Sequence, residues 1–259
     1  MQALSKAKLR LFRSLRGKKQ RQKERLFTVE GEKLVQEALN SQFEVKGVVL
    51  REDVQERYLK DLLFQESQIQ NLPLWLTSSK DYREISTLEN SEGILAVIRL
   101  PKEELRDTLP VGPGFILDTL QDPGNVGTIL RIADWFGMPN VLFTQGTVDL
   151  WNPKTLRASM GAIFRIKPYR IKNEREFILR FASRIWLADM EGVPLPKSQM
   201  KWEDFILLGN EAQGLSPHMK EDLAHRRVSI PGFGGAESLN VSVAAGILAY
   251  ELCRDRERE

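Results

Sequence analysis

The chain has 259 residues, 42% of them hydrophobic, which is enough for one large domain or two ordinary ones with buried cores. Its longest apolar run, around Val241 to Tyr250, is far shorter than the roughly 20 residues that span a bilayer, so no membrane protein is expected. A single cysteine, Cys253, excludes an internal disulfide and a multi-cysteine zinc site, and only two histidines are present, so no metal centre is expected.

The net charge of +3 is unevenly distributed along the chain. Residues 1–25 hold ten lysines and arginines against one acid, Glu24, and carry +9, so the remaining residues carry −6. This concentration of positive charge predicts a helical arm that contacts RNA. Two other interpretations stay open, a solvated helix face and a cleaved targeting peptide. Apolar residues at near-helical spacing, and the direct continuation into residues 27–39, disfavour the targeting peptide.

Between residues 26 and 100, short apolar strands alternate with amphipathic helices. The strands are predicted at 26–31, 46–50, 72–78 and 93–100, and the helices at 32–40, 52–67 and 79–87. This alternation indicates a small layered α/β domain over residues 1–100. Residues 101–113 combine three prolines, a glycine and several charges, and are predicted to be a linker.

Residues 114–259 repeat the alternation with more apolar strands, predicted at 114–120, 140–145, 164–171, 184–189, 204–211 and 226–231. The helices are predicted at 125–137, 152–163, 173–183 and 240–254. These strands are continuously apolar rather than alternating, which is typical of a mostly parallel sheet that is covered on both faces. The second half is therefore predicted to be a separate α/β domain.

Three polar, glycine-bearing loops follow predicted strands of this second domain, and ligands of open α/β sheets bind at the carboxyl ends of strands. The first loop, "TLQDPGNVGTILR", lacks the Lys-Ser/Thr pair of a phosphate-binding loop, so a nucleotide hydrolase is disfavoured. Asn125 lies at the predicted helix start, where it either caps the helix or holds a polar group of a ligand. Arg131, taken with this loop alone, is best explained by a surface ion pair.

The second loop places Gly209, Asn210 and Glu211 directly after an apolar strand. A carboxylate buried there needs a partner, and both Arg131 and a ligand ammonium are candidates. Gly214 permits a turn with positive φ before the next helix.

The third loop, "PGFGGAESLNVSVA", is rich in glycine and opens the last helix. Ser238 is expected to cap that helix, and the glycines let the backbone approach a flat ligand closely. The small residues that follow favour tight helix packing, within the chain or across a dimer.

Taken together, the three loops resemble the motifs of the SpoU (TrmH-like) family of RNA 2′-O-ribose methyltransferases, in the SPOUT class. The first motif runs from Asp122 to Arg131, the second from Gly209 to Gly214, and the third from Ile230 to Ala244. Residues 157–166, "RASMGAIFRI", resemble a further segment of the family, and the order and spacing of all four make the resemblance specific. Residues 14–39 are similar to the family's substrate-binding extension, which has a ribosomal-protein-L30e-like fold.

The resemblance implies that residues 114–259 form a catalytic domain with a deep trefoil knot, which periodicity alone does not predict. It also implies S-adenosylmethionine as cofactor, RNA as partner, no metal, and a homodimer with the catalytic pocket at its interface. The implied catalytic residues are Arg131, Asn125, Glu211, Ser238 and Asn240. The implied cofactor-binding residues are Gly209, Asn210, Gly214, Ile230, Pro231 and Leu239. The residues expected to bind RNA are Arg16, Lys18, Lys19, Arg21, Lys23 and Arg157.

The function that the resemblance implies is methyl transfer from S-adenosylmethionine to a ribose 2′-hydroxyl, most directly in large-subunit ribosomal RNA of the cytoplasm. Arg131 is expected to stabilise the developing alkoxide, because a guanidinium stays protonated and cannot itself accept the proton. A transfer-RNA 2′-O-methyltransferase and a non-catalytic RNA-binding protein of the same fold are the alternatives.

Overall fold

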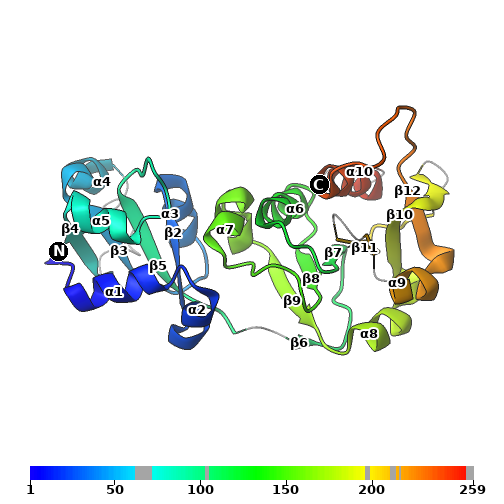
Figure 1. Ribbon diagram of the computed structural model, residues 1–259, viewed down its shortest axis with the longest axis horizontal. Helices are drawn as coiled ribbons and strands as arrows, with labels where there is room; N and C mark the ends of the chain where they lie inside the picture. The colour runs from blue at the N-terminus through cyan, green and yellow to red at the C-terminus, as the bar shows by residue number, and fades with distance from the viewer. Residues whose placement is uncertain (62–71, 103–104, 196–198, 211–213, 216, 255–259) are drawn as a thin grey trace. The chain divides into compact units, whose positions relative to one another are not determined.

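The computed structural model describes residues 1–61, 72–102, 105–195, 199–210, 214–215 and 217–254 (Figure 1). The chain divides into two compact units. The first comprises residues 1–102 and 151–164, and the second comprises residues 103–150 and 165–259. Each unit contains its own sheet with helices, so the predicted α/β class is confirmed. No helix in these ranges is long and apolar enough to cross a membrane.

The first unit contains a five-stranded mixed sheet in the order β1-β4-β3-β5-β2. Its strands are β1 (Gln2–Ala3), β2 (Leu26–Glu30), β3 (Val45–Arg51), β4 (Leu74–Thr77) and β5 (Ile94–Arg99). β3 runs parallel to β4 and antiparallel to β5, which also pairs antiparallel with β2. The four longer strands lie where the sequence predicts them. The two-residue β1 is too short to leave an apolar pattern.

The helices of the first unit are α1 (Lys6–Ser14), α2 (Lys18–Glu24), α3 (Glu32–Leu39), α4 (Gln55–Asp61) and α5 (Ser79–Ile85). The basic segment thus forms two helices rather than one. The break falls at Gly17, whose backbone is extended and whose residue type disfavours a helix interior. The apolar side of α1 packs on the sheet, where the rings of Phe12 and Trp75 lie 5.4 Å apart. The predicted continuation of α4 to residue 67 lies outside the described residues.

A segment from the second half of the sequence completes the core of the first unit. It contains α7 (Pro153–Ser159) and the short helix η2 (Ala162–Phe164). The ring of Trp151 lies 4.9 Å from that of Phe27, and the ring of Phe164 lies 5.2 Å from that of Phe43. The sequence-based boundary at residue 100 misses this segment, because the contacts that hold it join residues more than 100 positions apart.

The second unit contains a seven-stranded sheet in the order β12-β10-β11-β7-β8-β9-β6, and its described strand pairs are all parallel. Its strands are β6 (Leu105–Arg106), β7 (Gly114–Leu117), β8 (Asn140–Phe143), β9 (Lys167–Ile171), β10 (Ile185–Pro194), β11 (Phe205–Leu208) and β12 (Arg227–Ser229). Every residue of β7, β8 and β11 is buried, which agrees with the continuous apolar runs in the sequence. β6 lies within the predicted linker.

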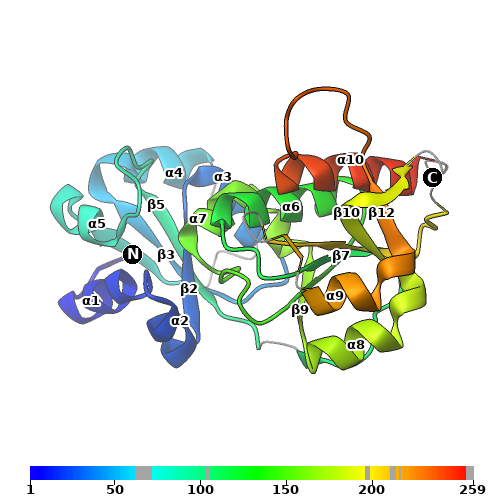
Figure 2. The same cartoon turned by 45° about the vertical axis from the view of Figure 1, so that its right-hand side comes forward.

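Helices cover both faces of this sheet. α6 (Pro123–Trp135) and α10 (Val241–Cys253) lie side by side on one face, and α8 (Glu174–Arg180) and α9 (Pro217–Asp222) lie on the other (Figure 2). Gly246 of α10 faces Ile132 of α6, and a Cβ built at Gly246 would lie 3.7 Å from Cδ1 of Ile132, an ordinary packing distance. Further along both helices, the rings of Phe136 and Tyr250 lie 6.5 Å apart. The trefoil knot stays a prediction.

Candidate functional site

Polar side chains of the first and third loops meet where α6 and α10 begin. Nδ2 of Asn240 donates a hydrogen bond of 3.0 Å to Oδ1 of Asn125, although 115 positions separate the two residues. Oδ1 of Asn240 accepts from the backbone N–H of Ser242 at 2.9 Å and caps α10. The cap is therefore Asn240, which directly precedes the first helical residue, and the prediction that Ser238 caps this helix is wrong.

The N-terminus of α6 is capped by Asp122. Its Oδ1 accepts from the backbone N–H of Asn125 at 2.8 Å, and Pro123 follows in the first turn, where its missing N–H costs nothing. The capping role considered for Asn125 thus belongs to Asp122, and the Asn125 side chain contacts Asn240 instead. An Asp-Pro pair ahead of an apolar helix is a local start signal that predicts this cap.

Asn210 joins the second loop to the first. Its Nδ2 donates to the carbonyl oxygen of Thr119 at 2.8 Å. This contact follows from the sheet order, because β11 and β7 are paired in parallel and end at the same edge. Gly214 has φ +68 and donates its N–H to the Asn210 carbonyl at 2.9 Å, which is the turn that the sequence predicts. Glu211 lies outside the described residues, so its predicted ion pair with Arg131 stays a prediction.

Thr119 holds a backbone conformation that is rare for its residue type. Its φ is +54, and a β-branched residue in the left-handed region costs on the order of 1–3 kcal/mol. Its N–H donates to Oγ1 of Thr144 at 3.0 Å, and that hydroxyl donates to Oδ1 of the buried Asp118 at 3.2 Å. These contacts fix the first loop at the carboxyl end of β7. No local sequence signal identifies a threonine in this conformation.

Arg131 is exposed on α6, two turns after the cap. Within the described part of the chain, no side chain or carbonyl forms a hydrogen bond or ion pair with its guanidinium. The surface ion pair that the first loop alone favours is therefore not seen there. An arginine whose donors are unengaged is available to an anionic oxygen of a ligand.

The remaining predicted site residues lie at strand ends or in the third loop. Gly209 follows β11 and is half-buried, and Ile230 follows β12 and is also half-buried. Residues 231–240 are exposed throughout, and Leu239 keeps 49% of its surface. Among the ranges that the structure describes, Ser238 has no hydrogen bond to Asn125, Asn240 or Arg131, and no cluster of His, Cys, Asp and Glu could hold a metal.

One predicted RNA-binding arginine is buried in the first unit. Arg21 is 3% exposed, and its guanidinium donates to the carbonyls of Leu15 and Arg16 at 2.8 and 2.7 Å. It thereby satisfies carbonyls at the end of α1 that lack helical partners. The prediction that Arg21 contacts RNA is therefore wrong, since a charge count cannot show that a cation faces inward.

Two more of these arginines bind the loop that follows α5. Arg16 donates to the carbonyl oxygen of Ser86, and the half-buried Arg157 donates to Oγ1 of Thr87 at 2.7 Å. Beneath the loop, the buried carboxylate of Glu30 accepts from the hydroxyls of Ser86 and Ser91 at 2.5 and 2.6 Å. Arg16 and Arg157 are thus held by contacts within the protein, which favours a structural role for both.

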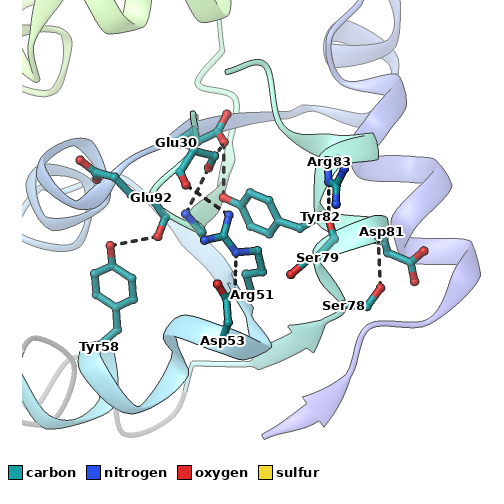
Figure 3. A network of polar contacts seen from close by, with 12 residues as sticks. Glu30, Arg51, Asp53, Tyr58, Ser78, Ser79, Asp81, Tyr82, Arg83 and Glu92 are labelled. Atoms are coloured by element: carbon teal, nitrogen blue, oxygen red, sulfur yellow. Dashed lines mark hydrogen bonds and ion pairs between the residues drawn. The ribbon is translucent and has the colours of Figure 1, made fainter. Parts of the chain in front are cut away.

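Glu30 belongs to a buried polar network of the first unit (Figure 3). The hydroxyl of Tyr82 points toward Glu30 at 3.5 Å, and the guanidinium of Arg51 lies 5.9 Å from the Tyr82 ring. Burial raises the pKa of Tyr82 far above its usual range, so the phenol stays protonated and remains a donor. This network holds in place the loop whose residues Ser86 and Thr87 accept hydrogen bonds from Arg16 and Arg157.

Three predicted RNA-binding lysines remain free of such contacts. Lys18, Lys19 and Lys23 are exposed on α2, and none has a hydrogen bond or ion pair with a described residue. Their ammonium groups are available to phosphates.

α10 presents a stripe of exposed apolar side chains. Val243, Ile247 and Tyr250, spaced by four and three residues, keep 51%, 37% and 60% of their surfaces exposed. Trp135 on the neighbouring α6 keeps 82%. Exposed apolar side chains that form a larger patch are typical of surfaces that bind a protein, a membrane or a ligand. We call these four residues the α6/α10 apolar face.

The sequence matches the SpoU rRNA Methylase family over residues 114–250 and an MRM3-like substrate binding domain over residues 6–96. It is 34% identical, over 251 residues and 95% of each chain, to the 23S rRNA (guanosine(2553)-2′-O)-methyltransferase RlmP of Bacillus subtilis. It is 27% identical to the mitochondrial rRNA methyltransferase 3 of Homo sapiens, with 89% of this chain and 68% of that one covered. An AdoMet-bound rRNA methyltransferase structure from Sinorhizobium meliloti matches with a TM-score of 0.82 at 27% identity, covering 100% and 99% of the chains.

Proposed function

The chain belongs to the SpoU rRNA methylase family, and from this premise we propose that it transfers a methyl group from S-adenosylmethionine to a ribose 2′-hydroxyl of ribosomal RNA. The observation that carries the proposal is the hydrogen bond between Asn125 and Asn240, which joins the first and third motifs at the start of the helix that also carries the unengaged Arg131. The rRNA substrates named for the relatives support large-subunit RNA, because RlmP acts on 23S rRNA.

The loops at the strand ends fit a nucleoside cofactor. Among the described residues, no atom lies within 4 Å of a Cβ built at Gly214 or Gly232, which leaves room beside the backbone for a flat ligand. When bound, S-adenosylmethionine supplies an electrophilic methyl group on its sulfonium. We assign its binding to the loops after β11 and β12 and the start of α10, with the residues Gly209, Asn210, Gly214, Ile230, Pro231 and Leu239.

Arg131 is the residue that we assign to the reacting ribose. Its guanidinium donates to the 2′-oxygen or the adjacent phosphate and stabilises the charge that develops as the hydroxyl loses its proton. Because Arg131 stays protonated, water or an RNA phosphate accepts that proton. Asn125 and Asn240 hold each other and orient the ribose, and we give Glu211 and Ser238 the same orienting role.

Substrate RNA is bound, in this proposal, by the first unit. Lys18, Lys19 and Lys23 contact phosphates, which positions a folded RNA without reading its sequence. The methylated nucleotide lies in an unpaired stretch, where its ribose is accessible.

Replacing Lys18, Lys19 and Lys23 together by glutamine is expected to weaken RNA binding and flatten its salt dependence. Each lost phosphate contact lowers the slope of log Kobs against log salt by about 0.7–0.9, so three contacts lower it by roughly 2–3. Filter binding of ribosomal RNA across a salt series measures the slope. Lys33→Gln on the neighbouring α3 is the matched control, since Lys33 lies among Glu32, Glu37 and Glu92. An unchanged salt slope in the triple variant would show that α2 does not bind RNA and is a solvated helix face.

The α6/α10 apolar face supports a homodimer as the active form. We propose that two copies of the second unit pack through this face, which lies beside Arg131 on α6 and beside Asn240 at the start of α10. We also propose that residues 114–259 contain a trefoil knot. For the location of the protein we propose the cytoplasm, where it would meet its ribosomal RNA substrate.

The direct test is methyl transfer with labelled S-adenosylmethionine to RNA from cells that lack the protein. We expect label in large-subunit ribosomal RNA at one ribose, which mapping of 2′-O-methylation with and without the protein locates. Label in transfer RNA instead would show that the protein is a transfer-RNA methyltransferase. No label in any RNA, with binding retained, would favour a non-catalytic RNA-binding protein.

A further inference from the structure

The loop between β12 and α10 carries one aromatic side chain, Phe233, that no described residue covers. Residues 231–240 are exposed throughout, and Phe233 keeps 98% of its surface exposed. Both views show this loop reaching away from the rest of its unit (Figures 1 and 2). A phenylalanine in this position adds nothing to the core, so its burial energy is available only to a ligand or partner.

The residues around Phe233 leave its position adaptable. Gly232, Gly234 and Gly235 flank it, and a Cβ built at any of them meets no atom of the described residues within 4 Å. Through these glycines, the loop packs against none of the described elements. The ring can therefore adjust to the plane of a flat partner without displacing other residues.

The ends of the loop connect this ring to the reacting groups. Ile230 continues β12, while Asn240 ends the loop and donates to Asn125 on the helix that carries Arg131. A flat group that binds Phe233 is thus held by the same loop that ends at the catalytic asparagine pair.

The chemistry of the loop favours an RNA base over a protein surface. The exposed apolar side chains of α6 and α10 form a stripe on helices, whereas Phe233 stands alone between glycines. Protein-binding surfaces are marked by contiguous apolar patches, and a single ring between glycines does not form such a patch. Unpaired bases, by contrast, are bound by single aromatic rings that stack on them, whatever the base.

We propose that Phe233 stacks on an unpaired base of the substrate RNA and so positions the target ribose at Arg131 and the asparagine pair. The proposal rests on the proposed function and adds a contact that determines how RNA enters the site.

Three substitutions separate stacking from plain apolar contact. Phe233→Leu keeps an apolar side chain but removes the aromatic face, Phe233→Ala removes both, and Phe233→Tyr keeps the ring. We expect the leucine and alanine variants to raise the KM and the filter-binding Kd for unmodified large-subunit ribosomal RNA by about 5- to 100-fold, and tyrosine to stay near wild type. The affinity for S-adenosylmethionine, measured by calorimetry, and the mass by light scattering should not change. Val111→Ala, at another exposed apolar residue, is the control.

Each contrary result assigns Phe233 elsewhere. A leucine variant with wild-type RNA affinity would overturn stacking. Weaker S-adenosylmethionine binding in the leucine variant would assign the ring to the cofactor, and a lower mass would assign it to the dimer. If the wild type binds this RNA but transfers no methyl group, the proposed function fails, while the Kd values of the variants still decide the role of Phe233.

Discussion

Arg131→Ala is expected to lower kcat for methyl transfer by about 10²- to 10³-fold, the usual loss when one preorganised donor to a developing negative charge is removed. Arg131 is exposed and has no hydrogen bond or ion pair with a described residue, so its removal leaves the fold intact. Its guanidinium has no assigned contact with the cofactor, so the affinity for S-adenosylmethionine should change little. Single-turnover transfer to ribosomal RNA measures the first quantity, and calorimetry measures the second.

Two further arginine variants make this result specific. Arg131→Lys keeps the positive charge but loses the planar pair of donors, and we expect it to recover only part of the rate. Arg175→Ala removes an exposed arginine of α8 that pairs with Asp222, and its rate should equal that of wild type. If Arg131→Ala retained most of its turnover, the role assigned to this residue would be wrong.

Val243→Glu is expected to convert the proposed homodimer into a monomer and to abolish methyl transfer with it. Val243 is the first residue of the α10 stripe in the α6/α10 apolar face and keeps 51% of its surface exposed, so glutamate is tolerated in the free subunit. In a dimer the new carboxylate would be buried without a partner on both sides of the interface, which costs several kcal/mol. Sedimentation equilibrium should show a dimer Kd raised by at least about 100-fold.

The control for this variant is Leu179→Glu on α8, where leucine is also 51% exposed but lies on the opposite face of the sheet. It should leave the mass and the rate unchanged. A Val243→Glu protein that remains a dimer would move the subunit interface away from α10.

The parts of the fold that depend on local patterns are predictable from the sequence. Continuous apolar runs predict the buried parallel strands β7, β8 and β11, and their order along the chain places three loops at strand ends. The break between α1 and α2 at Gly17 is not evident, because apolar residues keep helical spacing up to Leu15. The packing of Trp151 on Phe27 is unpredictable for a different reason, since it depends only on tertiary contacts.

The candidate site shows the same division. The motifs identify Asn125, Asn240 and Arg131 as candidate site residues. The hydrogen bond between Asn125 and Asn240 could not be predicted, because it forms only when α6 and α10 pack side by side. Charge patterning predicts that the basic segment contacts RNA, but it cannot show that Arg21 faces inward, because only the structure shows which cations donate to backbone carbonyls.

The packing of residues 151–164 into the first unit has a consequence for synthesis on the ribosome. A nascent chain that ends at residue 102 lacks Trp151 and Phe164, so the aromatic faces of Phe27 and Phe43 stay uncovered. The N-terminal unit therefore cannot reach its final form while the chain is still in its first half, unlike domains that fold in order as they emerge. The first unit can complete its fold only after strand β8 of the second unit and residues 151–164 have been synthesised. Folding of the first unit therefore depends on synthesis of part of the second, although each unit has its own sheet.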